Sequence, residues 1–180
     1  MSLEQFKDSL PAYAKDIKLN LGSVLTPEGA PDLTQNQIHG IALASAYATK
    51  DAAVIAAIAS ESVLSDPEKE AAKAAATIMG MNNIYYRFVH LVSDKEYGKL
   101  PAKLRMSVIG TPGIEKVDFE LYSLAVSAIN GCGMCMDAHV REVEKAGISR
   151  TGVQSAIRIA AVVNAAAQAH VIETLQALPA

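Results

Sequence analysis

Alanine-rich segments with helical periodicity run almost the whole length of this chain and restrict the folds that it can form. Of its 180 residues, 31 are alanine and only 9 are aromatic. Alanine has the highest helix propensity and is depleted in β-strands, where β-branched and aromatic side chains pack better. No alternating run of apolar and polar residues predicts a strand. The chain is therefore predicted to be all-α, and a β-sandwich or β-barrel is disfavoured.

The overall composition narrows the classes of function. Hydrophobic residues make up 51% of the chain and charged residues 19%, which is typical of a packed domain and not of a disordered segment. A net charge of −3 leaves no basic surface of the kind that binds nucleic acid. Polar residues interrupt the apolar stretches, as Glu61 and Arg158 do, before they reach the length of a membrane span. We therefore expect neither nucleic acid nor a membrane as a partner.

The start of the chain and the cysteine content bear on the compartment. Glu4 and Asp8 interrupt the N-terminal segment, which lacks the pattern of a secretory signal peptide, so a cytoplasmic protein is expected. The two cysteines are Cys132 and Cys135. A purely structural disulfide is rare in a reducing compartment. The pair is therefore open to a redox, a metal-binding or an incidental interpretation.

Capping motifs, prolines and glycines divide the chain into about seven to nine helices. Ser2–Gln5 and Ser65–Glu68 are capping boxes, and Thr151–Gln154 is a third that is weakened by its glycine. Pro11 either ends a first short helix or begins the next, and a loop follows over Gly22–Pro31. Helices are then predicted from Thr34 to about Thr49, on to about Ser62, and from Asp66 to about Val92, followed by a turn over Ser93–Lys99. The remaining predicted helices are a short one from Pro101 that stops at Gly110–Gly113, one from Asp118 to about Asn130, one that holds the cysteines and ends at Gly147, and one from about Thr151 to Leu178.

A faint internal repeat suggests two related halves. A shift of 50 residues places Glu70 on Glu120 and Tyr85 on Cys135. Alanine-rich helices align at almost any offset, so shared composition explains the match equally well. We treat the chain as one domain over 1–180, with halves at about 1–95 and 100–180 as a hypothesis.

The most informative motif is the C-x-x-C formed by Cys132 and Cys135, with His139 four residues later. Cysteines three apart in a helix share a face, so a disulfide can form between them. A helix that begins near Cys132 would expose N–H groups that favour a thiolate, and this argument favours Cys132 as the reactive thiol. His139 lies one turn beyond Cys135 on the same face, and its position favours Cys135.

Glu120 is a candidate partner for His139. It lies eleven residues before Gly131, and His139 lies eight residues after it. If Gly131 and Gly133 form a tight reversal between antiparallel helices, the two side chains reach similar depth. Glu120 also begins a polar stripe that continues through Ser123, Ser127 and Asn130 on an otherwise apolar helix. A carboxylate that contacts an imidazole, which in turn contacts a thiol, can relay protons.

Each candidate residue has an ordinary structural interpretation. A structural zinc site needs four ligands, and Cys132, Cys135 and His139 supply three. The segment 79–86, which contains an Asn pair, is interpreted as helix core, with Arg87 and His90 either beside it or facing water. His39 and His170 have no partner that the sequence identifies, and Lys15, Asp16 and Lys18 are typical of a solvated face.

At Glu120, Cys132, Cys135 and His139 the sequence resembles the AhpD/carboxymuconolactone decarboxylase-like superfamily, and within it the AhpD alkyl hydroperoxidases. The pattern E-x11-C-x2-C-x3-H is specific, and the likeness covers nearly the whole chain. The resemblance implies an all-helical homotrimer with two related halves. It also implies a weak hydroperoxidase that reduces a peroxiredoxin, AhpC. Its disulfide would be reduced by dihydrolipoamide on a 2-oxo-acid dehydrogenase component, supplied by NADH through lipoamide dehydrogenase.

The resemblance also implies roles for the four residues, with no metal and no tightly bound cofactor. By position, Cys135 is the attacking thiol, Cys132 is its disulfide partner, and His139 with Glu120 forms the proton relay. Met134 departs from the family pattern, which often has a histidine between the cysteines. A thioether carries no proton, so His139 and Glu120 suffice, or peroxide turnover and partner preference differ.

Three functions compete at this point. The leading hypothesis is an antioxidant thiol–disulfide enzyme that acts on hydroperoxides. A carboxymuconolactone decarboxylase-like enzyme is the second, and the C-x-x-C counts against it because that chemistry needs no dithiol. A non-enzymatic helical oligomer, with or without a metal, is the third.

Overall fold

The computed structural model describes residues 1–176, and within that range the chain is helical and contains no strand. Nine α-helices and two short 3-10 helices follow one another along this part of the chain. They are α1 (Leu3–Ser9), η1 (Ala12–Ala14), α2 (Lys15–Val24), α3 (Gln35–Thr49), α4 (Ala52–Ser60), α5 (Asp66–Leu91), η2 (Lys95–Lys99), α6 (Ser107–Gly110), α7 (Lys116–Ile129), α8 (Gly133–Lys145) and α9 (Arg150–Gln176). The predicted all-α fold is confirmed.

Side-chain caps fix where most of the helices begin. Ser2 and Thr34 form complete capping boxes at the starts of α1 and α3. Asp51 caps α4 by accepting a hydrogen bond from the N–H of Val54 at 2.8 Å. Lys50, in the left-handed region at φ 63°, ends α3 and turns the chain directly into α4.

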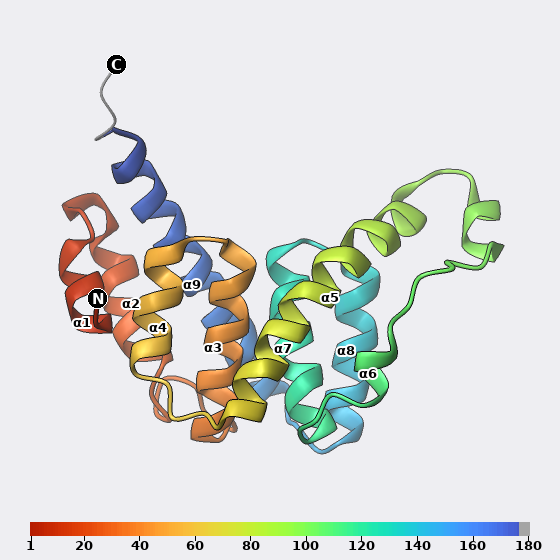
Figure 1. The fold of residues 1–180 in the computed structure, drawn as a ribbon, viewed down its shortest axis with the longest axis horizontal. Coiled ribbons are helices and arrows are strands. Elements are labelled where there is room, and N and C mark those ends of the chain that lie inside the picture. The colour runs from red at the N-terminus through yellow and green to blue at the C-terminus, as the bar shows by residue number, and fades with distance from the viewer. Residues whose placement is uncertain (177–180) are drawn as a thin grey trace.

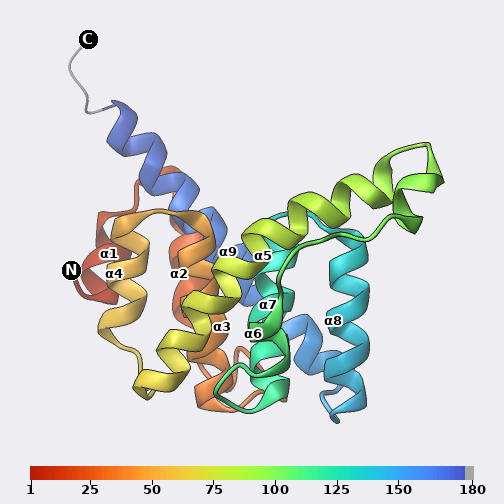
Figure 2. The ribbon, with the colours of Figure 1, turned by 45° about the vertical axis from the view of Figure 1, so that its right-hand side comes forward.

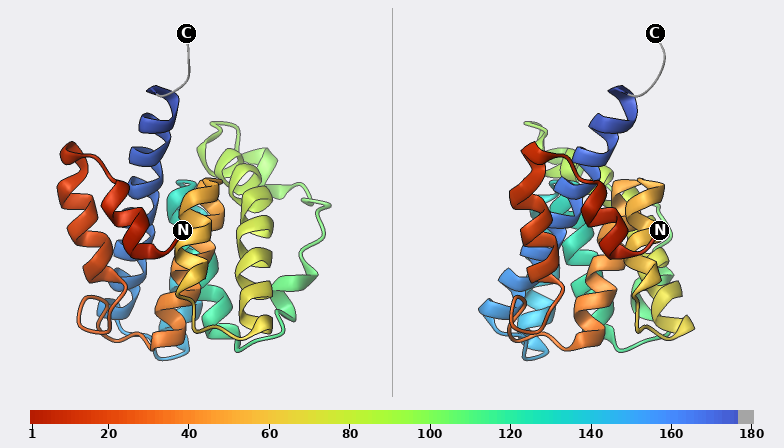
Figure 3. Two further views of the ribbon diagram at one scale, coloured as in Figure 1. Left: turned by 60° about the vertical axis from the view of Figure 1, so that its left-hand side comes forward. Right: turned by 90° about the vertical axis from the view of Figure 1, so that its left-hand side faces the viewer.

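Four helices, α3, α5, α7 and α9, form the centre of the molecule, and α8 packs against α5 and α7 (Figures 1 and 2). The N-terminal helices lie at one side, where α2 packs against α9 and α1 against α4 (Figure 3). One continuous hydrophobic core joins all of these elements. Because this core crosses the boundary between the two hypothetical halves, the halves do not pack as separate units, and their common origin stays a prediction.

Small residues allow the central helices to approach closely. A Cβ atom built on Gly40 of α3 would lie 2.1 Å from the ring of Tyr122 of α7, so only glycine fits at this contact. Tyr122 is fully buried, as are most of the alanines that line the centre of α3. The alanine content of the sequence therefore serves close helix packing as well as helix propensity.

The helix α9 is long and apolar enough, by length and composition alone, to cross a membrane. This corrects the expectation that no segment of the sequence is long and apolar enough to span a membrane. Its apolar side chains nevertheless have partners in the fold, because Ala156, Ile159 and Val163 are buried and the helix packs on α2, α3 and α7. Core helices of soluble proteins commonly combine this length with this hydropathy.

The second half of α5 extends away from the body and carries η2 at its end (Figure 1). From there the segment 101–106 returns without regular structure to α6 (Figures 1 and 2). We call residues 84–106 the arm. Five of its large apolar side chains are exposed, among them Ile84 at 67% and Leu91 at 72%.

Two predicted boundaries are wrong, and a third agrees with the structure. Pro101 does not open a helix, because residues 101–106 have no regular structure and Lys103 lies in the left-handed region at φ 51°. The loop predicted from Gly22 begins after Val24, since Gly22 lies inside α2. The last helix begins at Arg150, in agreement with the predicted start at about Thr151, because the hydroxyl of Ser149 accepts the N–H of Gly152 and supplies the cap. Its predicted end at Leu178 lies outside the described residues.

Candidate active site

The cysteine pair lies at the N-terminus of α8, directly after a tight turn. Gly131 makes that turn in the left-handed region at φ 69°, which favours glycine, whereas Gly133 is already the first residue of the helix. Cys132 is the N-cap residue, and its sulfur accepts a hydrogen bond from the N–H of Cys135 at 3.3 Å. The two cysteines form a disulfide with their Cα atoms 5.3 Å apart. The exposed N–H groups of a helix start stabilise the thiolates that reduction of such a bond produces.

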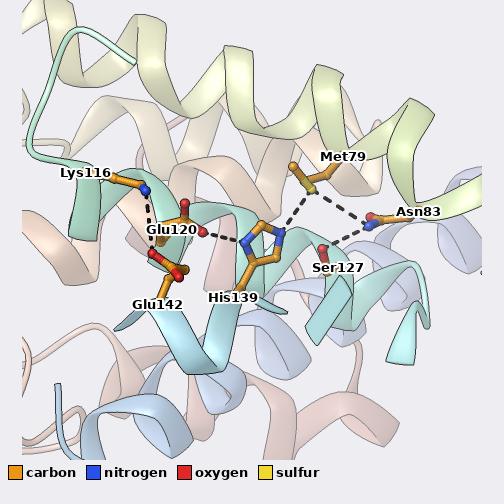
Figure 4. Close-up of polar contacts among 7 residues, drawn as sticks. All are labelled: Met79, Asn83, Lys116, Glu120, Ser127, His139 and Glu142. Carbon is orange, nitrogen blue, oxygen red and sulfur yellow. Dashed lines mark hydrogen bonds and ion pairs between the residues drawn. The ribbon is translucent and has the colours of Figure 1, made fainter. Parts of the chain in front are cut away.

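The structure brings Glu120 and His139 together. Oε2 of Glu120, on α7, lies 2.6 Å from Nδ1 of His139, on α8 (Figure 4). Both side chains are buried, with 4% of Glu120 and 8% of His139 exposed. The turn at Gly131 folds α8 back along α7, so the two residues reach the same depth, as their spacing from the turn predicts. A buried carboxylate at this distance fixes the orientation of the imidazole.

The second ring nitrogen of His139 contacts a residue that the sequence analysis did not assign to the site. Nε2 lies 3.3 Å from the Sδ atom of Met79, on α5 (Figure 4). Across residues 1–176, Met79 is the hydrogen-bond partner of this nitrogen, and neither cysteine sulfur is. The carboxylate–imidazole part of the predicted relay is therefore present, and the imidazole–thiol contact is not formed while the disulfide is closed.

Cys135 and His139 open into one cavity of about 250 Å³. Its wall is mainly apolar and comes from α5, α6, α7 and α8. The other lining residues are Met79, Asn82, Tyr86, Met106, Ile109, Glu120, Ala138 and Glu142. Cys132 is fully buried, whereas 7% of Cys135 is exposed, so Cys135 presents its side chain to the cavity. Such a pocket can admit the apolar tail of an organic substrate beside a reactive sulfur.

Two residues of the polar stripe on α7, Ser127 and Asn130, make their side-chain contacts with Asn83 of α5. Asn83 donates to Ser127 at 2.9 Å and accepts from Asn130 at 2.9 Å, and all of these atoms are at least partly buried. Arg87 donates to the backbone oxygen of Asn130 at 2.6 Å, next to the turn before the cysteines. The interpretation of segment 79–86 as helix core holds for Asn83. These bonds also fix α5 against the start of α8.

The surface over the disulfide is formed by residues from α5 and α8. His90 is exposed, and a Cβ atom on Gly133 would lie 3.5 Å from its ring. Met134, between the two cysteines, is 37% exposed and points out of the core. His90 therefore stands beside the cysteine turn, where the sequence analysis left its position open.

The remaining histidines have partners away from the cavity. Nδ1 of His170 lies 2.7 Å from Asp51, the cap of α4, and Nε2 of His39 lies 2.7 Å from the amide of Gln35. Burial lowers the pKa of His39 below its usual range. On the surface, Lys18 pairs with Asp8 at 2.7 Å, whereas Lys15 and Asp16 are exposed. None of these residues lines the cavity of Cys135.

A metal site is not evident in the described chain. Among residues 1–176, no three His, Cys, Asp or Glu side chains gather in a group that could hold a metal ion. Oε2 of Glu120 and Nδ1 of His139 instead contact each other.

The sequence is similar to one protein family model and to several named proteins. Residues 95–177 match the carboxymuconolactone decarboxylase family. A protein named alkyl hydroperoxide reductase AhpD from Coxiella burnetii is 57% identical over 173 residues, which cover 95% of this chain and 98% of that protein. Proteins of the same name from Hyphomonas neptunium and Rhizorhabdus wittichii are 55% and 52% identical, over 100% and 94% of this chain and 100% and 98% of their own length.

Proposed function

The chain belongs to the AhpD family of alkyl hydroperoxide reductases, and we propose that its Cys132–Cys135 pair reduces organic hydroperoxides and the disulfide of a peroxiredoxin of the AhpC type. The observation that carries this proposal is the cavity in which Cys135 and the Glu120–His139 pair meet. A thiol, a general base and an orienting carboxylate are the groups that peroxide reduction by a cysteine needs.

The proposed cycle begins with the reduced dithiol. The thiolate of Cys135 attacks the outer oxygen of a hydroperoxide, the O–O bond breaks, and the alkoxide leaves as an alcohol after taking a proton. Cys135 is then a sulfenic acid. The thiol of Cys132 displaces its hydroxyl as water and closes the disulfide. Attack of Cys135 on a peroxiredoxin disulfide would follow the same order, with a mixed disulfide in place of the sulfenic acid.

A dithiol must then reopen the disulfide. We propose that dihydrolipoamide, carried on a 2-oxo-acid dehydrogenase component, supplies the two electrons and becomes lipoamide. Lipoamide dehydrogenase would reduce lipoamide again with NADH. Support for this donor comes from the family resemblance, together with the exposed residues Arg87, His90 and Met134, which leave room for a carrier beside the cysteine turn. We expect the reaction to take place in the cytoplasm.

A coupled assay tests the proposal. The protein is mixed with NADH, lipoamide dehydrogenase and lipoamide, and cumene hydroperoxide is added with and without a peroxiredoxin. We expect NADH consumption in both cases and faster consumption with the peroxiredoxin. Cys132→Ser and Cys135→Ser should each abolish turnover, because a single cysteine cannot close the disulfide. Full turnover by Cys135→Ser would rule out the mechanism.

The match to the carboxymuconolactone decarboxylase family gives a second candidate function its basis. Decarboxylation of such a lactone does not use a dithiol. Alkylation of both reduced cysteines should therefore abolish the peroxidase activity and leave a decarboxylase activity intact. Lactone turnover that survives alkylation, together with no NADH consumption, would favour this second function.

A further inference from the structure

The imidazole of His139 lies between two hydrogen-bond acceptors. Nδ1 faces Glu120 at 2.6 Å, and Nε2 faces the Sδ atom of Met79 at 3.3 Å (Figure 4). A thioether sulfur has lone pairs and no hydrogen to donate. Met79 therefore receives a hydrogen bond only if a proton lies on Nε2.

Whether both of these contacts are hydrogen bonds depends on where the protons of the Glu120–His139 pair lie. A neutral imidazole has one N–H group. If that group points at Glu120, the lone pair of Nε2 faces the lone pairs of sulfur. Both contacts become hydrogen bonds when the pair holds one further proton, either as an imidazolium beside a carboxylate or as an Nε2–H imidazole beside a carboxylic acid. In both arrangements a proton lies on Nε2 and points at Met79.

The sulfur of Met79 is held in place by its neighbours. Only 1% of Met79 is exposed. The amide nitrogen of Asn83 lies 3.9 Å from Sδ, and the same nitrogen donates to Ser127 of α7 at 2.9 Å. Asn83 thus fixes the thioether from one side while His139 contacts it from the other. The acceptor is part of the core between α5, α7 and α8 and not a mobile side chain on the surface.

Other ionisable groups around the cavity do not contact Nε2. Glu142 of α8 lines the cavity, and its carboxylate lies 3.5 Å from Lys116. Tyr86 of α5 lines the cavity from the other side, where its hydroxyl lies 4.0 Å from the sulfur of Met106. Within the described part of the chain, Met79 is the side chain placed to accept the Nε2 proton.

We propose that Met79 is a positioning residue that holds a proton on Nε2 of His139 while the Cys132–Cys135 disulfide is closed. The proposal rests on the redox cycle given above. When a dithiol donor breaks the S–S bond, two electrons pass to the cysteines and the donor becomes a disulfide. The thiolate of Cys135 takes the proton from Nε2. The donor releases two protons, one of which goes to Cys132 and the other to water.

Reduction of the disulfide would therefore return His139 to the form that can act as a base. After this transfer His139 is neutral, with its Nδ1–H directed at Glu120 and with Nε2 free. A free Nε2 is the acceptor needed when the Cys135 thiol is deprotonated in the next cycle. Met79 thus keeps Nε2 protonated in the disulfide form, in which the Cys135 thiolate that reduction produces needs a proton donor. In the reduced form Nε2 carries no proton, and its hydrogen bond to Met79 is lost.

Nitrogen-15 NMR of protein labelled at histidine tests the position of the proton. The shift of a ring nitrogen reports directly whether it carries a proton, and a His139→Gln sample identifies the His139 signals among those of the four histidines. At pH 7 we expect Nε2 to be protonated in the disulfide form and unprotonated after reduction. An unprotonated Nε2 in the disulfide form would overturn the proposal.

Variants at Met79 separate its role from simple packing. Met79→Leu conserves the volume of the side chain and removes the acceptor, so we expect Nε2 to lose its proton at pH 7 in the disulfide form. Met79→Gln offers an acceptor oxygen at similar length and should restore the proton. Met81→Leu makes the same substitution on another face of α5 and should leave the signal unchanged. A proton that remains on Nε2 in Met79→Leu would contradict the proposal.

The rate of disulfide opening tests the proton transfer itself. In a single turnover with dihydrolipoamide, we expect Met79→Leu to be reduced about three- to tenfold more slowly than wild type, and Met81→Leu to match wild type. Equal rates for all three proteins would refute the transfer. The NMR measurement needs no turnover, so a protonated Nε2 in a protein without peroxidase activity would sustain the proton assignment while the proposed function fails.

Discussion

Cys132 and Cys135 differ sharply in their surroundings although only two residues separate them. Cys132 caps α8, is fully buried and accepts the N–H of Cys135. Cys135 lines the cavity together with His139. The helix-start argument from the sequence favours Cys132, and the spacing of His139 favours Cys135. A substrate that enters the cavity meets Cys135, and for this reason we keep Cys135 as the proposed attacking thiol.

Glu120 provides a test of the proposed proton relay at the level of one residue. Glu120→Gln retains an oxygen that can accept from Nδ1 of His139 and removes the negative charge. We expect the reaction of the reduced protein with cumene hydroperoxide to slow by about 10- to 100-fold, since general-base catalysis commonly contributes this much or more. Stopped-flow measurement of a single turnover gives the rate without interference from the donor system.

Glu142→Gln is the matched control for this variant. Glu142 lines the same cavity, but its carboxylate pairs with Lys116 on the surface and does not contact the imidazole. We expect its rate to stay within about twofold of wild type, as for most changes of exposed charges. Similar losses in the two variants would mean that the charge of the cavity matters and the relay does not.

At the level of helices, the site was predictable where it depends on one helical hairpin. Glu120 and His139 lie on α7 and α8, and their depth follows from counting residues away from Gly131. Met79 lies 60 residues before His139 in the sequence. Its contact with the imidazole depends on how α5 packs across α7 and α8, and no local pattern encodes that register. The sequence therefore identified segment 79–86 as core but not Met79 as part of the site.

Helix boundaries show the same division between local and tertiary causes. The capping boxes at Ser2 and Ser65 act within four residues, and both were predicted correctly. Pro101 has the φ angle of a first helical residue, yet the segment after it has no regular structure as it returns from the arm to α6. Its path depends on the length that has to be spanned, which the sequence of the segment does not specify.

The crossing of α3 and α7 gives a prediction about stability. Gly40→Ala places a methyl group about where the ring of Tyr122 lies, and a fully buried tyrosine has little room to move. We expect the free energy of unfolding to fall by about 1–3 kcal/mol, the usual cost of overpacking a core. Urea denaturation followed by circular dichroism measures this change.

Gly80→Ala is the control on the neighbouring helix α5. No atom lies within 4 Å of a Cβ built on Gly80, which is exposed. We expect this variant to gain about 0.5–1 kcal/mol from the higher helix propensity of alanine. If Gly40→Ala also gained stability, the close contact between α3 and α7 would not limit the packing of the core.

At the scale of the whole molecule, the arm is the part that the hydrophobic core does not explain. It projects beyond the packed helices (Figure 1), and Ile84, Phe88 and Leu91 are 67%, 49% and 72% exposed along α5. Residues at these spacings share one face of a helix. Contiguous exposed apolar faces in soluble proteins commonly mark contacts with other chains. We therefore expect this face to pack against another copy of the chain in the homotrimer that the family resemblance implies.

Ile84→Glu tests this assignment. Light scattering of wild-type protein after gel filtration should give a mass three times the chain mass of 19.0 kDa. The variant should dissociate, because a carboxylate buried in an apolar interface is costly. Since Ile84 is exposed in the single chain, its fold should be unaffected, and circular dichroism verifies this. Leu19→Glu, at a similarly exposed position on α2, should leave the trimer intact. A monomeric wild type, or a trimeric Ile84→Glu, would show that the arm is exposed for another reason.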